Sequence, residues 1–394
     1  MNEFVPVSKA KELLKSLSIT PKTETLPIAQ ALGKFTAEYV ISPIAVPSFN
    51  NSGMDGYALA WADGGESRKV VDVIQAGSNP DFTLEKGTAV RIFTGAPVPK
   101  GADTVIQQEL ISRVGAEIFF EQKQISLGMN VRKRGAQCQK GEIVISSHTQ
   151  LSPGSIGLLA SLGIQSVSVF KSPKIGIILT GDEIIDLGNE LMPGQIFNSN
   201  GPALEAYLNK LGIREINSYK AKDEASEVVK VIQQALDEVD VLLLTGGISV
   251  GDYDFVKSGL EKNGVSQLFY KVKQRPGKPL YCGYKEEKII FALPGNPASV
   301  LSCFIQYVKP ILLEWMGNTS AWQKPLLLPV SQDFDKKAGL TFFLKAKNQE
   351  GKAVILPGQE SFNLLPFGIA DGLVEIPDDQ EHVEEGSLVA FYPW

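Results

Sequence analysis

Residues 240–254 read DVLLLTGGISVGDYD, and this stretch decides the expected fold. The apolar run at 241–244, bounded by Asp240 and Thr245, predicts a buried strand, and a helical pattern begins near residue 253. A glycine-rich loop between a strand and a helix favours anion binding, since backbone N–H groups approach phosphate oxygens closely where no Cβ intervenes. Two acids of the loop, Asp252 and Asp254, could hold Mg²⁺ against such a phosphate, although a plain glycine turn is the simpler alternative.

The composition excludes several classes of protein. The chain has 394 residues, too many for one compact core, so about two to four domains are expected. Hydrophobic residues at 43% and charged residues at 21% are typical of a folded soluble protein. The net charge of −6 argues against general electrostatic binding of nucleic acid. An anionic ligand would then need a local basic cluster.

A metal centre built on cysteine or histidine is not expected. Three cysteines lie far apart with no CxxC pair, and only two histidines are present. The N-terminal segment MNEFVPVSKAKELLKSL predicts an amphipathic helix over residues 8–17 and lacks the apolar region of a signal peptide. No apolar run approaches the roughly 18 residues needed to span a bilayer. We therefore expect a cytoplasmic protein without membrane contact.

Residues 46–142 contain three motifs among short β segments and turns. The motifs are VPSFNNSGMDGYALA (46–60), TGAPVPKGADTVIQQE (94–109) and GMNVRKRGAQCQKGE (128–142). Asp55 stands at a strand entrance, where ordinary turn chemistry is the alternative to a functional role. Arg132, Lys133 and Arg134 form a local basic cluster, for which a solvated charge run is the ordinary explanation and phosphate recognition the alternative. Helices are expected around residues 28–35 and over 151–162, the second capped by Ser152.

From residue 174 onward, strands and helices alternate. Strands are expected at 174–180, 213–219, 241–244, 267–272 and 288–293, with helices at 198–211, 225–239, up to residue 262, and at 298–315. Gly212 is expected to close the first of these helices. This regular alternation predicts a mainly parallel α/β domain.

Four of these strands end in unusual loops, namely TGDE (180–183), TGGISVGDYD (245–254), RPGKP (275–279) and PGNP (294–297). Parallel strands deliver such loops to one edge of the sheet, where ligands bind. That edge would hold four carboxylates and two cations, which are Asp182, Glu183, Asp252, Asp254, Arg275 and Lys278. Carboxylates suit a metal ion and cations suit phosphate oxygens, so a Mg²⁺–phosphate ligand is predicted.

These motifs also carry a family resemblance. With NNSGMDGYA, TGAPVPKGAD, GMNVRKRG, TGDE, GGISVGDYDFVK, RPGKP and LPGNPAS in family order over nearly the whole chain, the sequence resembles molybdopterin molybdenumtransferases, the MoeA and gephyrin E-domain family. The resemblance implies a multidomain α/β protein of four parts. They are a discontinuous helical linker domain (1–45 and 143–172), an inserted β-rich domain (46–142), a three-layer α/β molybdopterin-binding domain (173–318) and a C-terminal β-barrel (319–394).

The reaction implied by the resemblance inserts molybdate into adenylylated molybdopterin. Mg²⁺-dependent hydrolysis of the adenylate accompanies it and releases AMP and the molybdenum cofactor. The resemblance also implies a homodimer with a site shared between subunits, and the molybdopterin adenylyltransferase is a candidate second partner. Two alternatives remain, the adenylyltransferase step itself and a non-enzymatic scaffold of the gephyrin kind. The inserted domain and barrel argue against the first, and the retained acids argue against the second.

Site residues follow from the same resemblance. Asp182, Glu183 and Asp254 would serve the metal and the pyrophosphate, and Asp55 and Thr94 would face them from the partner subunit. The other residues implied to bind cofactor or oxyanion are Gly246, Gly247, Ser249, Gly251, Arg275, Lys278, Pro294, Asn296, Ser299, Arg134, Lys345 and Ser361.

Three positions depart from the family pattern. Gln137 stands where a carboxylate is usual, and a carboxamide holds Mg²⁺ less well. Lys345 stands where an arginine is usual, which keeps the charge but loses bidentate oxyanion recognition. Arg275 stands where a lysine is frequent. These departures leave the choice between molybdate and tungstate open.

Overall fold

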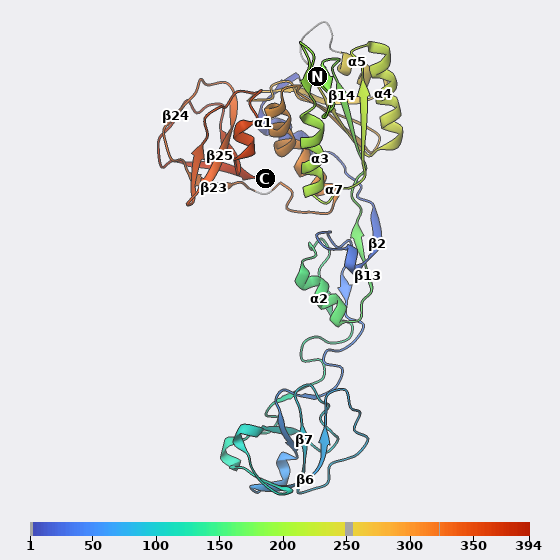
Figure 1. Cartoon of the computed structure of the whole chain (residues 1–394), viewed down its shortest axis with the longest axis vertical. Helices are drawn as coiled ribbons and strands as arrows, with labels where there is room; N and C mark the ends of the chain where they lie inside the picture. The colour runs from blue at the N-terminus through green and yellow to red at the C-terminus, as the bar shows by residue number, and fades with distance from the viewer. Residues whose placement is uncertain (1–2, 249–254, 323) are drawn as a thin grey trace. The chain divides into compact units, whose positions relative to one another are not determined.

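The chain divides into two compact units, shown in Figure 1. The computed structural model describes residues 3–248, 255–322 and 324–394. Unit 1 comprises Met1–Thr25, Gly33–Ala37 and Ser168–Trp394, and unit 2 comprises Leu26–Leu32 and Glu38–Val167. Each unit contains hydrophobic clusters of its own.

The main sheet of unit 1 is mostly parallel. Among the described residues, seven strands pair in the order β1 (Glu3–Val5), β19 (Ser266–Val272), β21 (Tyr281–Lys285), β22 (Lys288–Leu293), β18 (Val241–Thr245), β14 (Ile175–Thr180) and β17 (Ile216–Ala221). β21 runs antiparallel to both of its neighbours, and the other pairs are parallel. The mainly parallel sheet expected from the strand–helix alternation is therefore present. β21 was not predicted, because it joins β22 through a two-residue turn instead of a helix.

Both faces of this sheet are covered. In β14, Ile175 and Ile177 pack in one buried cluster, whereas Ile178 packs in another. The first cluster includes residues of α1 (Val7–Lys15), α3 (Asn200–Lys210), α6 (Pro297–Cys303) and α7 (Lys309–Trp315), and the second includes residues of α4 (Ala225–Glu238) and α5 (Phe255–Lys262). Figure 1 shows α4 and α5 on one side of β14 and α3 and α7 on the other. Burial on both sides explains why the strand is an unbroken apolar run.

The helix predicted over residues 298–315 is a continuous helical segment with an irregular middle. α6 begins with Pro297 at its first turn, a π-helical turn follows at Phe304–Val308, and α7 completes the segment. π-Helical turns are rare and occur frequently at functional sites. This one carries the buried polar side chains of Gln306 and Tyr307. α3 ends as expected, with Gly212 in the left-handed conformation at φ +80°.

The N-terminal segment corrects one predicted domain boundary. The sequence assigned residues 1–45 to the linker domain, yet β1 pairs in parallel with β19 and extends the α/β sheet. Val7, Ala10 and Leu14 of α1 are buried in the same cluster as Ile177. An amphipathic pattern identifies an apolar face, but it does not say which surface covers that face. The other predicted domain boundaries stay predictions.

A second sheet of unit 1 is built by the C-terminal residues. Its order is β20 (Gln274–Arg275), β25 (Thr341–Gln349), β27 (Gly372–Ile376), β29 (Leu388–Pro393) and β23 (Leu326–Pro329), with β26 (Lys352–Ile355) paired to β25. β24 (Phe334–Asp335) and β28 (His382–Val383) form a separate pair. Leu344 and Val374 lie in the sheet's own core, whereas Phe343 and Leu373 join the α/β core. Because β20 contains Arg275, this sheet continues directly into the RPGKP loop.

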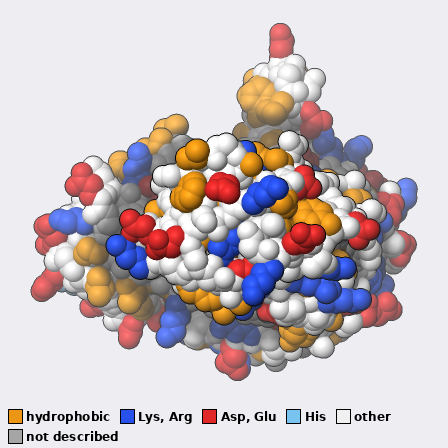
Figure 2. All heavy atoms as spheres, turned by 90° about the horizontal axis from the view of Figure 1, so that it is seen from below, with side chains coloured by type: hydrophobic (Ala, Val, Ile, Leu, Met, Phe, Trp, Pro, Cys, Tyr) orange, Lys and Arg blue, Asp and Glu red, His pale blue; other side chains and the backbone are white. Residues whose placement is uncertain are grey.

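Unit 2 is β-rich. Its main sheet has the order β8 (Thr104–Gln107), β5 (Gly56–Leu59), β7 (Thr88–Ile92), β6 (Ser67–Ile74), β10 (Glu117–Phe119) and β9 (Ser112–Val114). Short ladders join β11 (Val131–Arg132) to β4 (Asn51–Ser52) and β12 (Ile143–Ile145) to β3 (Val40–Ile41). Figure 2 shows a face of the molecule on which acidic, basic and hydrophobic side chains are interspersed.

Of the two helices predicted in unit 2, one is present as expected and the other is only a short turn. α2 (Pro153–Ser161) begins at Ser152, which forms a reciprocal capping box with Ser155. The helix expected at 28–35 is only a 3₁₀ turn at Ile28–Gln30. Gly33 soon follows in the left-handed conformation, which a helix cannot continue through. The remaining short strands of the chain are β2 (Thr23–Pro27), β13 (Ser166–Phe170), β15 (Ile184–Ile185) and β16 (Ile196–Phe197).

Candidate active site

A cavity of about 1140 Å³ lies in unit 1 at the carboxyl edge of the parallel strands. Residues that follow β14, β18, β19 and β22 all line it, as expected for strands that end at one edge. The predicted site residues that line it are Glu183, Gly246, Gly247, Arg275, Lys278, Pro294, Asn296, Ser299 and Ser361. Ser249, Gly251, Asp252 and Asp254 lie outside the described residues. The structure thus brings the four predicted loops to one cavity.

The loop after β18 requires glycine at its first two positions. Gly246 has φ +86° and Gly247 has φ +63°, a region that side chains disfavour. A Cβ at Gly246 would lie 2.8 Å from Thr180 Oγ1, and one at Gly247 would lie 2.7 Å from Val256 Cγ2. Thr180 Oγ1 also donates to the Thr245 carbonyl at 3.2 Å. The ends of β14 and β18 are therefore held together, with bare backbone facing the cavity.

One carboxylate of the cavity lining, Asp223, was not predicted from the sequence. Asp223 lines the cavity together with Glu183, and it follows β17, another strand of the parallel set. Burial, and then the charges of Asp182 and Glu183, raise the pKa of Asp223, while a hydrogen bond from the Asp182 backbone opposes them. Three carboxylates are therefore close together. The available signal was position alone, since Asp223 follows a parallel strand at the ligand-binding edge.

The carboxylates fit the metal that the resemblance implies, although they do not form a preassembled centre. Among the described residues, no three metal-binding side chains are grouped in ligating positions. Oxygen ligands of this kind are nonetheless those that Mg²⁺ prefers. A divalent cation would also offset the repulsion from Asp182 and Glu183, which adds to the effect of burial in raising the pKa of Asp223. Asp182 and Glu183 are thus suitable ligands, and Asp254, the third predicted ligand, lies outside the described residues.

The cations of the cavity lining come from the RPGKP loop. The Arg275 guanidinium lies 5.3 Å from the centre of the Phe342 ring, and Lys278 Nζ lies 5.0 Å from the centre of the Phe4 ring. Both side chains line the cavity and are exposed. Cations supported by aromatic rings in this way are suited to bind an oxyanion or a phosphate.

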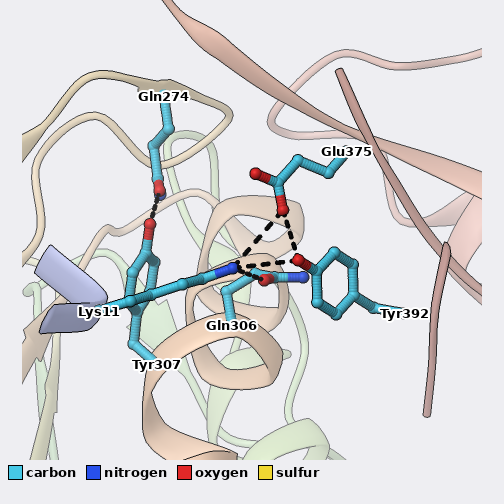
Figure 3. A network of polar contacts seen from close by, with 6 residues as sticks. All are labelled: Lys11, Gln274, Gln306, Tyr307, Glu375 and Tyr392. Atoms are coloured by element: carbon cyan, nitrogen blue, oxygen red, sulfur yellow. Dashed lines mark hydrogen bonds and ion pairs between the residues drawn. The ribbon is translucent and has the colours of Figure 1, made fainter. Parts of the chain in front are cut away.

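A network of polar contacts, shown in Figure 3, includes Gln274, the residue immediately before the RPGKP loop. Gln274 Nε2 donates to the Gly277 carbonyl at 3.0 Å, which closes the turn, and the Tyr307 hydroxyl donates to Gln274 Oε1. Next along the π-helical turn, Gln306 Oε1 accepts from Lys11 Nζ at 2.9 Å. The π-helical turn therefore contacts both the RPGKP loop, through Tyr307 and Gln274, and α1, through Gln306 and Lys11.

The network continues into the C-terminal sheet (Figure 3). Lys11 Nζ lies 3.5 Å from Glu375 Oε2, and the Tyr392 hydroxyl donates to the same oxygen at 2.6 Å. Burial lowers the pKa of Lys11, and Glu375 partly offsets that effect. α1, the π-helical turn and the C-terminal sheet are thus joined by charge-assisted contacts that no sequence pattern indicated.

Ser361 meets the PGNP loop directly. Asn296 Nδ2 donates to Ser361 Oγ at 3.0 Å, and the Ala298 amide donates to the Ser361 carbonyl at 3.2 Å. Glu360, Phe362 and Leu364 line the cavity beside it. Two predicted site residues from different sheets, Asn296 and Ser361, are therefore in contact.

Lys345 does not lie where the sequence analysis expected an oxyanion ligand. The side chain is 1% exposed and does not belong to the cavity lining. Its Nζ donates to three backbone carbonyls, those of Gly358, Glu360 and Asn363. Its position on β25 was predictable from sequence, but its inward direction was not.

Asp55 and Thr94 are paired in unit 2. Thr94 donates to Asp55 Oδ1 from its backbone N–H at 2.7 Å and from Oγ1 at 2.8 Å. These two bonds, the backbone one first, lower the pKa of Asp55, and the charge of Arg91 assists them. The Arg91 guanidinium lies about 5 Å from the ring centres of Tyr57 and Phe93. Arg91 is therefore a fixed cation beside the pair, and the sequence analysis did not single it out.

Two further predicted positions of unit 2 are exposed and held by their backbone. The Arg134 amide donates to Asn50 Oδ1 at 2.8 Å, and the Gln137 amide donates to the Val46 carbonyl at 2.8 Å. Both side chains are exposed. The two residues therefore belong to one ordered loop, and their roles stay predictions.

The geometry defines a class of protein before any comparison is made. A parallel α/β sheet ends in glycine-containing loops around a cavity that is lined by both carboxylates and cations. This is the arrangement of an α/β protein that binds a phosphorylated ligand at the carboxyl edge of its sheet. None of the helices in the described residues is long and apolar enough to cross a membrane.

Comparisons with known proteins identify the family within that class. Family models described as the MoeA N-terminal region (domain I and II), a probable molybdopterin binding domain and the MoeA C-terminal region (domain IV) match residues 5–163, 176–314 and 328–394. A molybdopterin molybdenumtransferase of Bacillus subtilis (strain 168) is 32% identical over 98% of this chain and 93% of its own length. One from Haemophilus influenzae is 37% identical over 80% of this chain and 78% of its own length.

Solved structures agree with the sequence comparisons. Two structures of molybdopterin biosynthesis MoeA proteins from Pyrococcus horikoshii match with TM-scores of 0.87 and 0.84, at 35% and 27% identity. They cover 99% of this chain, with 99% and 100% of their own chains matched. The chain belongs to the molybdopterin molybdenumtransferase (MoeA) family and has its multidomain fold.

Proposed function

We propose that this protein is a molybdopterin molybdenumtransferase that acts in molybdenum cofactor biosynthesis. It inserts molybdate into adenylylated molybdopterin, and hydrolysis of the adenylate releases AMP and the finished cofactor. The observation that carries the proposal is the convergence of four strand-end loops on one cavity that is lined by both carboxylates and cations. Full-length similarity to proteins named for this activity supports it.

The cavity suits a ligand that carries both phosphate and oxyanion groups. Arg275 and Lys278 would bind molybdate or a substrate phosphate, because both are exposed cations of the cavity lining. The backbone at Gly246 and Gly247 would lie against the pyrophosphate, since no Cβ prevents close approach. Ser361 and Asn296 would position the oxyanion from the opposite loop. Such chemistry depends on positioning more than on a side-chain nucleophile.

Asp182 and Glu183, with Asp223 beside them, would hold Mg²⁺. When bound, the cation would withdraw charge from the pyrophosphate and assist its hydrolysis. The carboxylates would orient the metal, and burial followed by the charges of Asp182 and Glu183 raises the pKa of Asp223, which places three acids near one another.

A second copy of the chain would complete the site. Asp55 and Thr94 form an exposed, rigid pair in unit 2, and the depressed pKa of Asp55 keeps it ionised at neutral pH. An ionised acid held by two donors is suited to orient water or an oxyanion's counter-ion. We therefore propose a homodimer in which unit 2 of one subunit faces the cavity of the other. The three-layer arrangement of the α/β part, the closed C-terminal barrel and cytoplasmic location belong to the same proposal.

The direct test mixes purified full-length protein with adenylyl-molybdopterin, Mg²⁺ and molybdate. AMP release that depends on molybdate is expected. AMP release that is equal with and without molybdate would contradict the transferase assignment. Formation of adenylyl-molybdopterin from ATP and molybdopterin would instead identify the adenylyltransferase alternative, and a protein inactive in both assays would favour the scaffold.

A further inference from the structure

We propose that Lys345 is a positioning residue that fixes the Ser361 loop, residues 356–364, against the cavity and does not itself bind the oxyanion. The inference rests on the proposed function for the identity of the ligand. It concerns a lysine that the sequence analysis placed among the oxyanion-binding residues, and it assigns that side chain a different task.

The hydrogen-bonding capacity of the ammonium group is fully used within the protein. Lys345 Nζ lies 2.8 Å from the carbonyl oxygen of Gly358, 3.2 Å from that of Glu360 and 3.3 Å from that of Asn363. An ammonium group has three donors and no acceptor. Because three carbonyls of one loop take all three, none remains for a ligand in the cavity.

The backbone of Lys345 holds the same loop. The Lys345 amide donates to Gln359 Oε1 at 3.0 Å, and Gln359 Nε2 donates back to the Lys345 carbonyl at 2.9 Å. The Leu356 amide also donates to the Lys345 carbonyl, at 3.0 Å. One residue at the centre of β25 therefore binds the start, the middle and the end of the loop.

The loop in turn places groups in the cavity. Glu360, Ser361, Phe362 and Leu364 line it, and Ser361 accepts hydrogen bonds from the Asn296 side chain of the PGNP loop and from the Ala298 amide. Displacing the carbonyls of residues 358, 360 and 363 would displace Ser361, which lies between two of them. Lys345 thus acts on the site through the loop and without contact with the ligand.

The environment of Nζ is consistent with a buried structural cation. Burial lowers the pKa of Lys345 to about 8, and the Glu360 carboxylate partly opposes that effect. The centre of the Phe367 ring lies 5.8 Å from Nζ and closes another side of the group. At neutral pH the amine is still protonated and offers three donors.

Arginine could not replace this lysine in the same role. The donors of a guanidinium diverge in a planar fork, whereas the three carbonyls converge on one nitrogen atom. Lys345→Arg therefore separates two hypotheses. A group needed only for its charge near the oxyanion would be replaced well by arginine, and a group needed for convergent donors would not.

The first experiment is hydrogen–deuterium exchange on the full-length protein without ligand. In Lys345→Met, amides of residues 356–365 should exchange at least about tenfold faster than in wild type, because charge-assisted hydrogen bonds are lost. β14, in the same unit, should keep its wild-type exchange. Lys345→Arg should accelerate the same loop. Lys288→Met is the matched control, since Lys288 Nζ donates to the Val239 carbonyl at 2.8 Å at the opposite edge of the main sheet. Unchanged exchange in Lys345→Met would overturn the proposal.

A second measurement needs no variant and covers the case in which Lys345→Met fails to fold. Wild-type protein is treated briefly with an amine-acylating reagent at neutral pH, where Lys345 is protonated, and modified lysines are located by mass spectrometry. Lys345 should stay unmodified with and without molybdate, whereas Lys278 should react and be protected by molybdate. A lysine of pKa about 8 that opened on the cavity would react early. Rapid labelling of Lys345 that molybdate suppresses would overturn the proposal. Neither readout uses AMP release, so failure of the proposed function is seen separately.

Discussion

Asp55 Oδ1 accepts two hydrogen bonds from Thr94, at 2.7 Å from the backbone N–H and at 2.8 Å from Oγ1. Both residues are exposed, so the pair does not contribute to a hydrophobic core. An acid and its two donors held in this way form a rigid surface anion. The relationship makes TGAPVPKG a loop that orients a specific carboxylate rather than a connection alone.

The first prediction concerns the titration of Asp55. Thr94→Val should raise the pKa of Asp55 toward its ordinary value of 3.8, but only part of the way, because the backbone donor is the larger cause and remains. Thr94→Ser keeps both donors and should leave the pKa low. Carbon-13 NMR of the carboxyl group during acid titration measures both variants.

The sign of the pH effect follows from the depressed pKa. A carboxyl group with a lower pKa in the folded state contributes stability above its unfolded pKa, and that contribution is lost as pH falls through the folded value. The folded-state pKa of Asp55 should be lower in wild type than in Thr94→Val. As the pH falls below 3.8, wild type should therefore keep the stability contributed by ionised Asp55 down to a lower pH than the variant does. Identical titrations of Asp55 in wild type and Thr94→Val would show that the hydroxyl has no influence.

The second prediction concerns Asp182, a ligand of the proposed metal site. Asp182→Asn should lower molybdate-dependent AMP release by about 100-fold or more, because a charge of the proposed metal site is removed. Its melting temperature should stay close to that of wild type. Asp186→Asn is the matched control from the same segment, since Asp186 pairs with Lys220 and, unlike Asp182, is not among the charges that act on Asp223. Full turnover by Asp182→Asn would remove Asp182 from the proposed site.

Much of the fold could be predicted from local sequence patterns. The run at 241–244 is buried in full, and the glycines after it have the positive φ angles that such a loop needs. Strand ends on a parallel sheet share an edge by topology, so the convergence of four loops followed without knowledge of any contact. The start of the helix at Ser152 could also be predicted from local sequence, because the capping interaction involves residues within one four-residue segment.

The parts that could not be predicted depend on contacts between distant segments. α1 has an amphipathic pattern, yet nothing in it specifies that Leu14 packs in the same cluster as Ile177. Asp223 stands in an ordinary charged stretch and becomes distinctive only beside Asp182 and Glu183. The sequence shows the charge of Lys345, but the three carbonyls that satisfy it come from residues 13 to 18 positions further along the chain.

The third prediction concerns the network behind the RPGKP loop. Tyr307→Phe removes the donor to Gln274 Oε1 and leaves a buried acceptor unpaired, so unfolding should become easier by about 1–3 kcal/mol. The half-saturating molybdate concentration should also rise, because Gln274 closes the turn between Arg275 and Lys278.

Tyr281→Phe provides a matched control for this loss. The Tyr281 hydroxyl is buried with no hydrogen-bond partner among the described residues, so its removal breaks no hydrogen bond and should leave stability unchanged or raise it. Denaturant unfolding of the two variants gives the comparison. Equal stability of Tyr307→Phe and Tyr281→Phe would show that the bond to Gln274 contributes nothing.

The last prediction concerns the shared site. If unit 2 of one subunit completes the cavity of the other, Asp55→Asn and Asp182→Asn inactivate complementary halves. A mixed dimer then has one site that carries both substitutions and one that carries neither. Mixing the two inactive variants under conditions that exchange subunits should restore about one quarter of the wild-type rate, because half of the re-formed dimers are mixed and each has one intact site.

A cavity completed within one chain predicts a different result. Each variant would then keep its own defect, and the mixture would stay as inactive as its components even when mass spectrometry shows mixed dimers. A double variant that carries both substitutions in one chain is the control. When it is mixed with wild type, each site of a mixed dimer contains one substituted residue, so the activity cannot exceed that of the wild-type chains alone. Sedimentation of only a 42.7 kDa species at the assay concentration would contradict the shared site without any kinetics. Restored activity, in contrast, requires that two chains contribute to one active site, since neither variant alone contains an intact set of residues.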